Sequence, residues 1–168
     1  MSARLKEYEN IEEELTNRLK QLLSGLPPNA ASIKVENVPR TGKGVWVTLK
    51  PANPAATSIG AYAENGLDMI YFSFGDYGPT WELPIEGYSR NAGKEELLRE
   101  VEDMSRAVIA GNCEYSRGLL SIRGRIQVDD CPYRVTDFFV FRALPPLRGT
   151  RKYEPYFESI STPSPENR

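Results

Sequence analysis

Two arginines, Arg123 and Arg125, alternate with small and apolar residues in "LLSIRGRIQV" at 119–128. Residues two apart on a β-strand share one face, so this spacing places both guanidinium groups side by side. Paired guanidinium groups bind carboxylates or phosphates through bidentate hydrogen bonds. The pattern predicts an anion-recognising strand face, with Arg117 and Arg134 nearby. The alternative is an exposed strand face that is neutralised by local acids.

A second group of candidate residues lies in "DMIYFSFGDYGPTWELP" at 68–84, where aromatic residues surround glycines and a proline. Alternation along the strand assigns Phe72 and Phe74 to the core, but it places no such demand on the loop that follows. Tyrosine and tryptophan are frequent interface anchors because they bury a large area and keep a polar tip. Trp81 is expected to pack in the core. The alternative is that this loop forms a binding edge, which would comprise Asp76, Tyr77, Trp81 and Glu82.

Carboxylates around the same loop offer a third kind of chemistry. Asp76, Glu82 and Glu86 could act as acid and base or hold a divalent cation, provided that their spacing in the fold suits it. Loop carboxylates more commonly form turns and keep a surface soluble. We therefore expect neither a metal site nor a cofactor.

The chain contains no histidine. This excludes a Ser-His-Asp or Cys-His nucleophile pair, histidine-ligated zinc, and imidazole acid–base chemistry near neutral pH. The glycine-rich "RTGKGVW" at 40–46 lacks the spacing of a phosphate loop and precedes a strand rather than a helix, so it predicts a hairpin turn. Enzymatic activity is thus uncertain, a non-catalytic role is favoured, and no catalytic residue is identified.

Composition sets the class of protein. The 168 residues carry a net charge of -2 and are 40% hydrophobic, which is typical of a single globular domain. We expect one domain over 1–160 and a disordered tail over 161–168. Apolar runs are too short for a membrane span, so a cytoplasmic location is expected. The balanced charge disfavours nucleic acid as a partner. Cys113 and Cys131 are expected to be reduced thiols.

Two helices are predicted from apolar residues at intervals of three and four. The first covers 3–24 and ends at Gly25. The second covers 94–110 and stops at Gly111 and Asn112, which tolerate a left-handed backbone. Their apolar stripes comprise Leu5, Tyr8, Ile11, Leu15, Leu19, Leu22 and Leu23, and Leu97, Leu98, Val101, Met104, Ser105, Val108 and Ile109.

Strand-like alternation occupies much of the remaining chain. Between two strands, Asn65 and Gly66 predict a two-residue type I' hairpin turn. That turn pairs Tyr62 with Met69, places Tyr71 on the same face, and leaves the opposite face for the core. Runs of strands rather than strict strand–helix alternation indicate an α+β fold. We expect a mainly antiparallel sheet of about six to eight strands with the two helices packed on it.

The segment "KEELLREVEDMSRAVIAGNCEYSRGLLSIRGRI" at 94–126 resembles part of a loose class of small bacterial proteins, in which a helix ending in an A-V-x-A-G turn leads into a hairpin. Some members of that class are immunity proteins, which bind and neutralise a toxin domain of their own cell. The resemblance covers this segment alone and contains no catalytic signature. It implies a stoichiometric binder of another protein.

The leading hypothesis is a non-catalytic, cytoplasmic protein-binding module that uses the aromatic and acidic loop edge or the arginine strand face. The resemblance implies that this module is immunity-like. The alternative is a small-molecule-binding domain or a cofactor-dependent enzyme. Its pocket would lie between helix and sheet and be lined by Tyr62, Met69 and Tyr71. Self-association through an open sheet edge is the third reading.

Overall fold

The structure is a computed structural model that describes residues 8–38, 43–75, 80–83, 93–117, 121–138 and 149–157. Its two helices are α2 (Ile11–Ser24) and α3 (Lys94–Ile109). The strands before α3 are β1 (Ala31–Asn37), β2 (Val45–Pro51), β3 (Ile59–Ala63), β4 (Ile70–Phe74) and β5 (Thr80–Leu83). Those after it are β6 (Cys113–Arg117), β7 (Ser121–Val128), β8 (Cys131–Phe138) and β9 (Gly149–Lys152).

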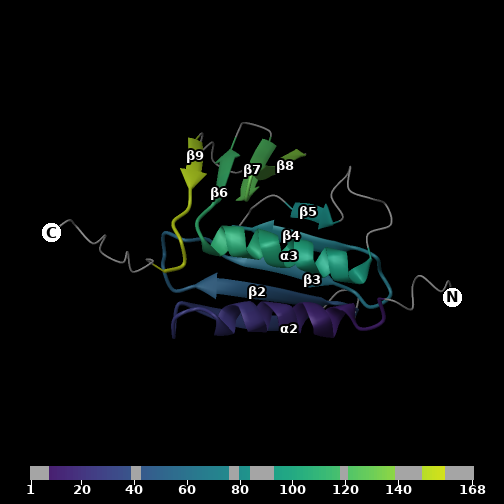
Figure 1. The fold of residues 1–168 in the computed structure, drawn as a ribbon. Helices are drawn as coiled ribbons and strands as arrows, with labels where there is room; N and C mark the ends of the chain where they lie inside the picture. Colours follow the sequence, from purple (N-terminus) through teal and green to yellow (C-terminus); the bar gives the residue numbers. More distant parts are fainter. Residues whose placement is uncertain are drawn as a thin grey trace.

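The strands form two antiparallel sheets rather than the one sheet that was expected. The first sheet has the order β1-β2-β3-β4-β5, and the second has the order β8-β7-β6-β9. The α+β class with antiparallel pairing is confirmed, whereas the arrangement in a single sheet is wrong. The reason is that α3 intervenes between β5 and β6, and alternation reports that a segment is a strand without reporting its partner. Figure 1 shows the second sheet above α3, on the opposite side from α2.

α3 forms where the apolar spacing predicts it, whereas the prediction of a helix from residue 3 is wrong at residues 8–10, which form a turn before α2 begins at Ile11. The stripe of α3 is buried, from Leu97 to Ile109, and that of α2 is buried at Ile11, Leu15, Leu19 and Leu22. Leu23 is half-buried, and Leu5 lies outside the described residues.

Gly111 ends α3 as its position in the sequence predicts. Its φ is +78°, and its N–H donates to the carbonyl of Val108 while the N–H of Asn112 donates to that of Ala107. This pair of hydrogen bonds is the Schellman motif, which satisfies carbonyls at the end of a helix.

The hairpin at Asn65 and Gly66 differs from the predicted one. Tyr62 pairs with Tyr71, not with Met69, and Ala63 pairs with Ile70. Gly66 has a φ of +84° but Asn65 has no positive φ, and the N–H of Leu67 donates to the carbonyl of Glu64. These features fit a type II turn in a longer loop. The register is shifted by two residues, so the predicted division of side chains between the two faces is still correct.

Contacts with the start of α2 account for this longer loop. The N–H of Glu12 donates to Asn65 Oδ1 at 3.2 Å, and the N–H of Asn65 donates to Glu12 Oε1 at 2.8 Å. The N–H of Gly66 also donates to the carbonyl of Tyr8. Asn10, the residue that precedes the helix, makes no side-chain cap hydrogen bond. Asn65 therefore caps α2 from a distant part of the chain.

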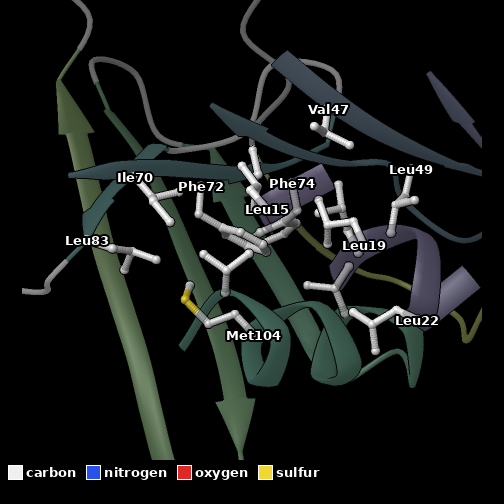
Figure 2. Packing of buried hydrophobic residues seen from close by; sticks show 14 of the residues in the cluster. Leu15, Leu19, Leu22, Val47, Leu49, Ile70, Phe72, Phe74, Leu83 and Met104 are labelled. Atoms are coloured by element: carbon white, nitrogen blue, oxygen red, sulfur yellow. The ribbon is translucent and has the colours of Figure 1, made fainter. Parts of the chain in front are cut away.

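The core lies between the helices and the first sheet, and it continues into the second sheet. Figure 2 shows side chains of α2, α3 and the first sheet converging, among them Leu15, Phe72 and Met104. Ile126 of β7 and Tyr153, which follows β9, belong to the same buried cluster. The segment after β9 lies against the domain, with Tyr153 and Tyr156 buried.

Candidate functional site

Strand β7 presents Arg123 and Arg125 to solvent while its alternate residues are buried. Ile122, Gly124 and Ile126 are buried, and both arginines are exposed. The predicted alternation is confirmed. These arginines, together with Arg134 of β8 and Lys152 of β9, define a surface that we name the basic face.

The strand register places three further charged residues in one row with Arg125 across the second sheet. Arg125 pairs with Arg134 on one side and with Glu114 of β6 on the other, and Glu114 in turn pairs with Lys152. Neighbouring strands lie about 4.8 Å apart, so this row places three cations and one carboxylate across roughly 15 Å of sheet. The basic face therefore has a positive excess.

A second row, one pleat further along, sets Arg123 among hydroxyl groups. Arg123 pairs with Ser116 of β6, and Ser116 pairs with Thr150 of β9. The two rows enclose a surface hollow of about 430 Å³. The hollow is lined by Glu114, Ser116, Arg123, Gly124, Arg125, Arg134 and Thr150.

Neighbouring side chains fix one arginine and leave two available. Arg125 donates to Gln127 Oε1 at 3.1 Å, and its Nη1 lies 3.6 Å from a carboxylate oxygen of Glu114. Gln127 is itself held by a hydrogen bond to the carbonyl of Asp129 at 2.7 Å. Within the described part of the chain, Arg123 and Arg134 form no ion pair. These two guanidinium groups are the ones that an incoming anion would meet.

The opposite side of this sheet anchors it to the core. Tyr115 of β6 stacks on Tyr153 with 5.8 Å between ring centroids, and Tyr153 in turn contacts Phe74 of the first sheet edge-on at 6.0 Å. Burial raises the pKa of the Cys113 thiol to about 12. Cys113 is therefore a neutral packing residue at physiological pH, consistent with the expected reduced thiol.

The aromatic loop edge is only partly described. Trp81 lies on β5 and is 2% exposed, with its ring 5.4 Å from that of Phe74, so the expected core packing of Trp81 is confirmed. Glu82 is exposed on the other face of β5. Asp76, Tyr77 and Glu86 lie outside the described residues.

The residues expected to line a pocket between helix and sheet lie elsewhere. Tyr62 and Tyr71 are half-buried on the face of the first sheet that is directed away from the core residues. Met69 belongs to the loop that precedes β4. The two helices pack against the other face, where the buried core residues lie.

Among the described residues, no cluster of three or more histidine, cysteine, aspartate or glutamate side chains could hold a metal ion. None of the described helices has both the length and the apolarity to cross a membrane. No family model, curated protein or solved structure matches the chain. The function is therefore inferred from the geometry of the surfaces.

Alternation along β7 identified Arg123 and Arg125, and Arg134 was expected nearby, but sequence analysis missed Lys152 of the basic face. It also missed Glu114, Ser116 and Thr150, which lie beside the arginines through the pairing of β6 with β7 and β9. The segment at 149–152 is short and follows a proline-rich stretch, so nothing in its pattern marks it as a strand. Its place beside β6 is a long-range pairing that only the fold reveals.

Proposed function

We propose that the chain is a cytoplasmic, non-catalytic protein-binding module that docks an acidic segment of a partner protein on its basic face. The observation that carries this proposal is the presence of two exposed arginines, Arg123 and Arg134, beside the 430 Å³ hollow, neither of which forms an ion pair with another described residue. Arginine is enriched at the centres of protein interfaces and binds carboxylates through two parallel hydrogen bonds. Ser116 and Thr150 add hydroxyl donors at the same place.

The composition of the basic face favours a protein partner over RNA. Proteins that read single-stranded RNA stack the bases on aromatic rings. Tyr115 and Tyr133 pair with Gly124 and Ile126 and so take the other face, which leaves Phe138, paired with Ser121 at the end of β8, as the single aromatic position in register with the arginines among the described strand residues. A face with cations and hydroxyl groups suits carboxylates that are spaced along a polypeptide.

An immunity-like role is the specific form of this proposal. It draws on the resemblance of 94–126 to a class that includes immunity proteins, and on a charge pattern suited to an acidic target. Electrostatic complementarity speeds association and excludes wrong partners, which is what a stoichiometric inhibitor of one toxin domain requires.

The test begins with a pull-down of the tagged protein from its native lysate at moderate salt. Proteins that are retained, and small molecules that are released on denaturation, are identified by mass spectrometry. The Arg123→Ala, Arg134→Ala double variant should weaken binding of a retained protein by about tenfold or more, because hydrogen bonds to charged groups contribute roughly 1.5 to 3 kcal/mol each. Calorimetric titration of the purified pair measures this change.

A matched control removes the same charge from another surface. Lys20 on α2 and Lys50 on β2 are exposed, and the Lys20→Ala, Lys50→Ala variant should bind the partner as the wild type does. Equal affinity of the arginine double variant and the wild type would remove the basic face from consideration.

A hollow of about 450 Å³ favours small-molecule binding as a second candidate function. It lies where α2 and α3 end and is lined mainly by apolar residues, including Leu22, Leu26, Ile109 and Phe157. Its volume suits a small organic ligand. A small molecule that co-purifies without any protein would support this candidate, and Ile109→Trp, which fills the hollow, should then abolish its retention.

A further inference from the structure

Three aromatic side chains form a continuous row on the face of the first sheet that is directed away from the helices. Trp46 of β2 pairs with Tyr62 of β3, and Tyr62 pairs with Tyr71 of β4. The ring centroids lie 6.3 Å apart for Trp46 and Tyr62 and 5.9 Å apart for Tyr62 and Tyr71. We name Trp46, Tyr62 and Tyr71 the aromatic row.

Glycines beneath the row allow two of its rings to lie along the sheet. A Cβ atom at Gly60 would come within 2.7 Å of the Trp46 ring, and one at Gly44 would come within 2.5 Å of the Tyr62 ring. Each ring therefore occupies the space that a neighbouring side chain would otherwise take. The three rings are half-buried, so part of their surface remains open to a ligand.

Carboxylates flank the row at both ends and at its centre. Register continues the row to Glu36 on β1 and to Glu82 on β5. Glu36 pairs with Lys34 at 2.8 Å, whereas Glu82 is exposed and forms no ion pair within the described part of the chain. At the centre, the Tyr62 hydroxyl donates to Glu64 at 2.8 Å. Burial and this carboxylate raise the pKa of Tyr62 to about 12, so its ring stays neutral.

We propose that the aromatic row and Glu82 form a second binding surface, for an extended arginine- or lysine-bearing segment of another protein. Cations are attracted to the faces of aromatic rings, and the carboxylates add a complementary charge. The line from Glu36 to Glu82 crosses five strands and spans about 19 Å. An extended chain covers about 3.3 Å per residue, so this line accommodates roughly six residues. This surface is distinct from the basic face and selects the opposite charge.

The test uses a synthetic hexapeptide in which arginine alternates with serine, with both ends blocked. A second peptide replaces each arginine by citrulline, which keeps the shape of the side chain and removes its charge. Isothermal titration calorimetry measures both affinities. The arginine peptide should bind at least tenfold more tightly than the citrulline peptide.

Fluorescence provides a second readout of where the peptide sits. The chain has two tryptophans, Trp46 in the row and Trp81 in the core at 2% exposure. The arginine peptide should change the emission and reduce the quenching by acrylamide, because it covers Trp46.

Two variants assign the binding to the row. Tyr71→Leu keeps apolar volume but removes a ring, and Glu82→Gln removes the exposed carboxylate; each should weaken binding of the arginine peptide by about three- to tenfold. Asp130→Asn removes an exposed carboxylate of the second sheet and should leave the affinity unchanged. Because Glu82 is exposed, its variant remains informative even where Tyr71→Leu fails to fold.

Four results would overturn the proposal. The first is failure of the arginine peptide to bind at millimolar concentration, and the second is equal binding of the citrulline peptide. The third is binding of a neutral oligosaccharide such as cellohexaose in place of the peptide, which would make the row a sugar platform. The fourth is a dimer in gel filtration that Glu82→Gln dissociates, which would make the occupant a second copy of this chain.

Discussion

Glu100 on α3 is held in surroundings that disfavour its charge. Its Oε1 atom is buried and has no hydrogen-bond partner among the residues that the structure describes. Burial, followed by the nearby charges of Glu96 and Asp103, raises the pKa of the Glu100 carboxyl to about 7. The side chain is therefore protonated well above the pH at which an exposed glutamate ionises.

This raised pKa makes stability depend on pH. Between the ordinary value of 4.5 and about 7, the folded protein binds more protons at Glu100 than the unfolded chain does. The contribution of Glu100 to the free energy of unfolding is complete below 4.5 and decreases as the pH rises to about 7. Glu100→Gln should remove this decrease, so the variant should gain stability relative to wild type at pH 8 compared with pH 4.

Urea unfolding at the two pH values measures the difference between the proteins. Glu13→Gln serves as the control because Glu13 is exposed on α2. The same pH dependence in Glu100→Gln and in wild type would contradict the assignment.

Single residues also show how far the sequence could be read. Arg123 and Arg125 were found by alternation along one strand, and the burial of Trp81 was anticipated from its surroundings in the sequence. Trp46 was missed as a member of the aromatic row. It lies 16 residues from Tyr62, and only the pairing of β2 with β3 makes them neighbours. The face on which a residue lies could therefore be predicted within one strand, but its neighbours on other strands could not.

At the scale of elements, the start of α2 depends on the loop between β3 and β4. The first four backbone N–H groups of an α-helix have no partner within the helix, and the side-chain oxygen of a capping residue normally satisfies one of them. In this helix that oxygen comes from Asn65, which lies 53 positions from the N–H of Glu12. The loop and the helix consequently stabilise each other.

Replacing Asn65 should therefore destabilise the protein more than replacing Asn10, although Asn10 holds the capping position in the sequence. We expect Asn65→Ala to lower the free energy of unfolding by about 1 kcal/mol, the usual cost of a lost cap. Asn10→Ala should have little effect because its side chain makes no cap hydrogen bond. Urea denaturation followed by circular dichroism compares the two, and an equal loss in both variants would contradict the distant cap.

This hairpin also explains which part of the element-level prediction failed. The Asn-Gly pair correctly marked a turn with a positive φ at Gly66. The two-residue turn type was wrong because hydrogen bonds to Glu12 and Tyr8 favour a longer loop, and those partners are distant in the sequence. A shift of two residues preserves faces, so the core could still be predicted from alternation.

At the scale of the whole molecule, α3 joins the two sheets. It contacts β3 and β4 of the first sheet and β7 of the second. Ion pairs of Arg18 with Glu102 and of Lys94 with Glu14 also tie α2 to α3. Since buried residues of both sheets belong to one cluster, we expect them to unfold as a unit.

A substitution that creates a cavity in the second sheet should also change the unfolding of the first sheet. Ile126 of β7 is fully buried, and Ile126→Ala should lower the free energy of unfolding by about 2 to 5 kcal/mol. Both tryptophans lie in the first sheet, so their fluorescence and the circular dichroism signal should shift together. The exposed Arg123→Ala on the same strand is the control. A fluorescence midpoint that stays in place would instead indicate two independently folding units.

The division into two sheets was the largest feature that the sequence did not reveal. Local patterns predicted the helices and most strands, because periodicity depends on the burial of neighbouring residues. The pairing of β9 with β6 closes the second sheet across more than thirty residues, from Glu114 to Lys152. Such long-range contacts are decided by the whole chain, and the basic face depends on them.

The contact between Asn65 and α2 also bears on how the protein ages. Asparagine followed by glycine is prone to deamidation, because the unhindered nitrogen of glycine attacks the side-chain amide and releases ammonia. In this fold the Gly66 nitrogen donates to the carbonyl of Tyr8, while the Asn65 side-chain oxygen accepts from Glu12. Both reacting groups are thus held by other partners. Deamidation of Asn65 should therefore occur only when the loop separates from α2. The rate of deamidation would then report how often the loop and the helix separate.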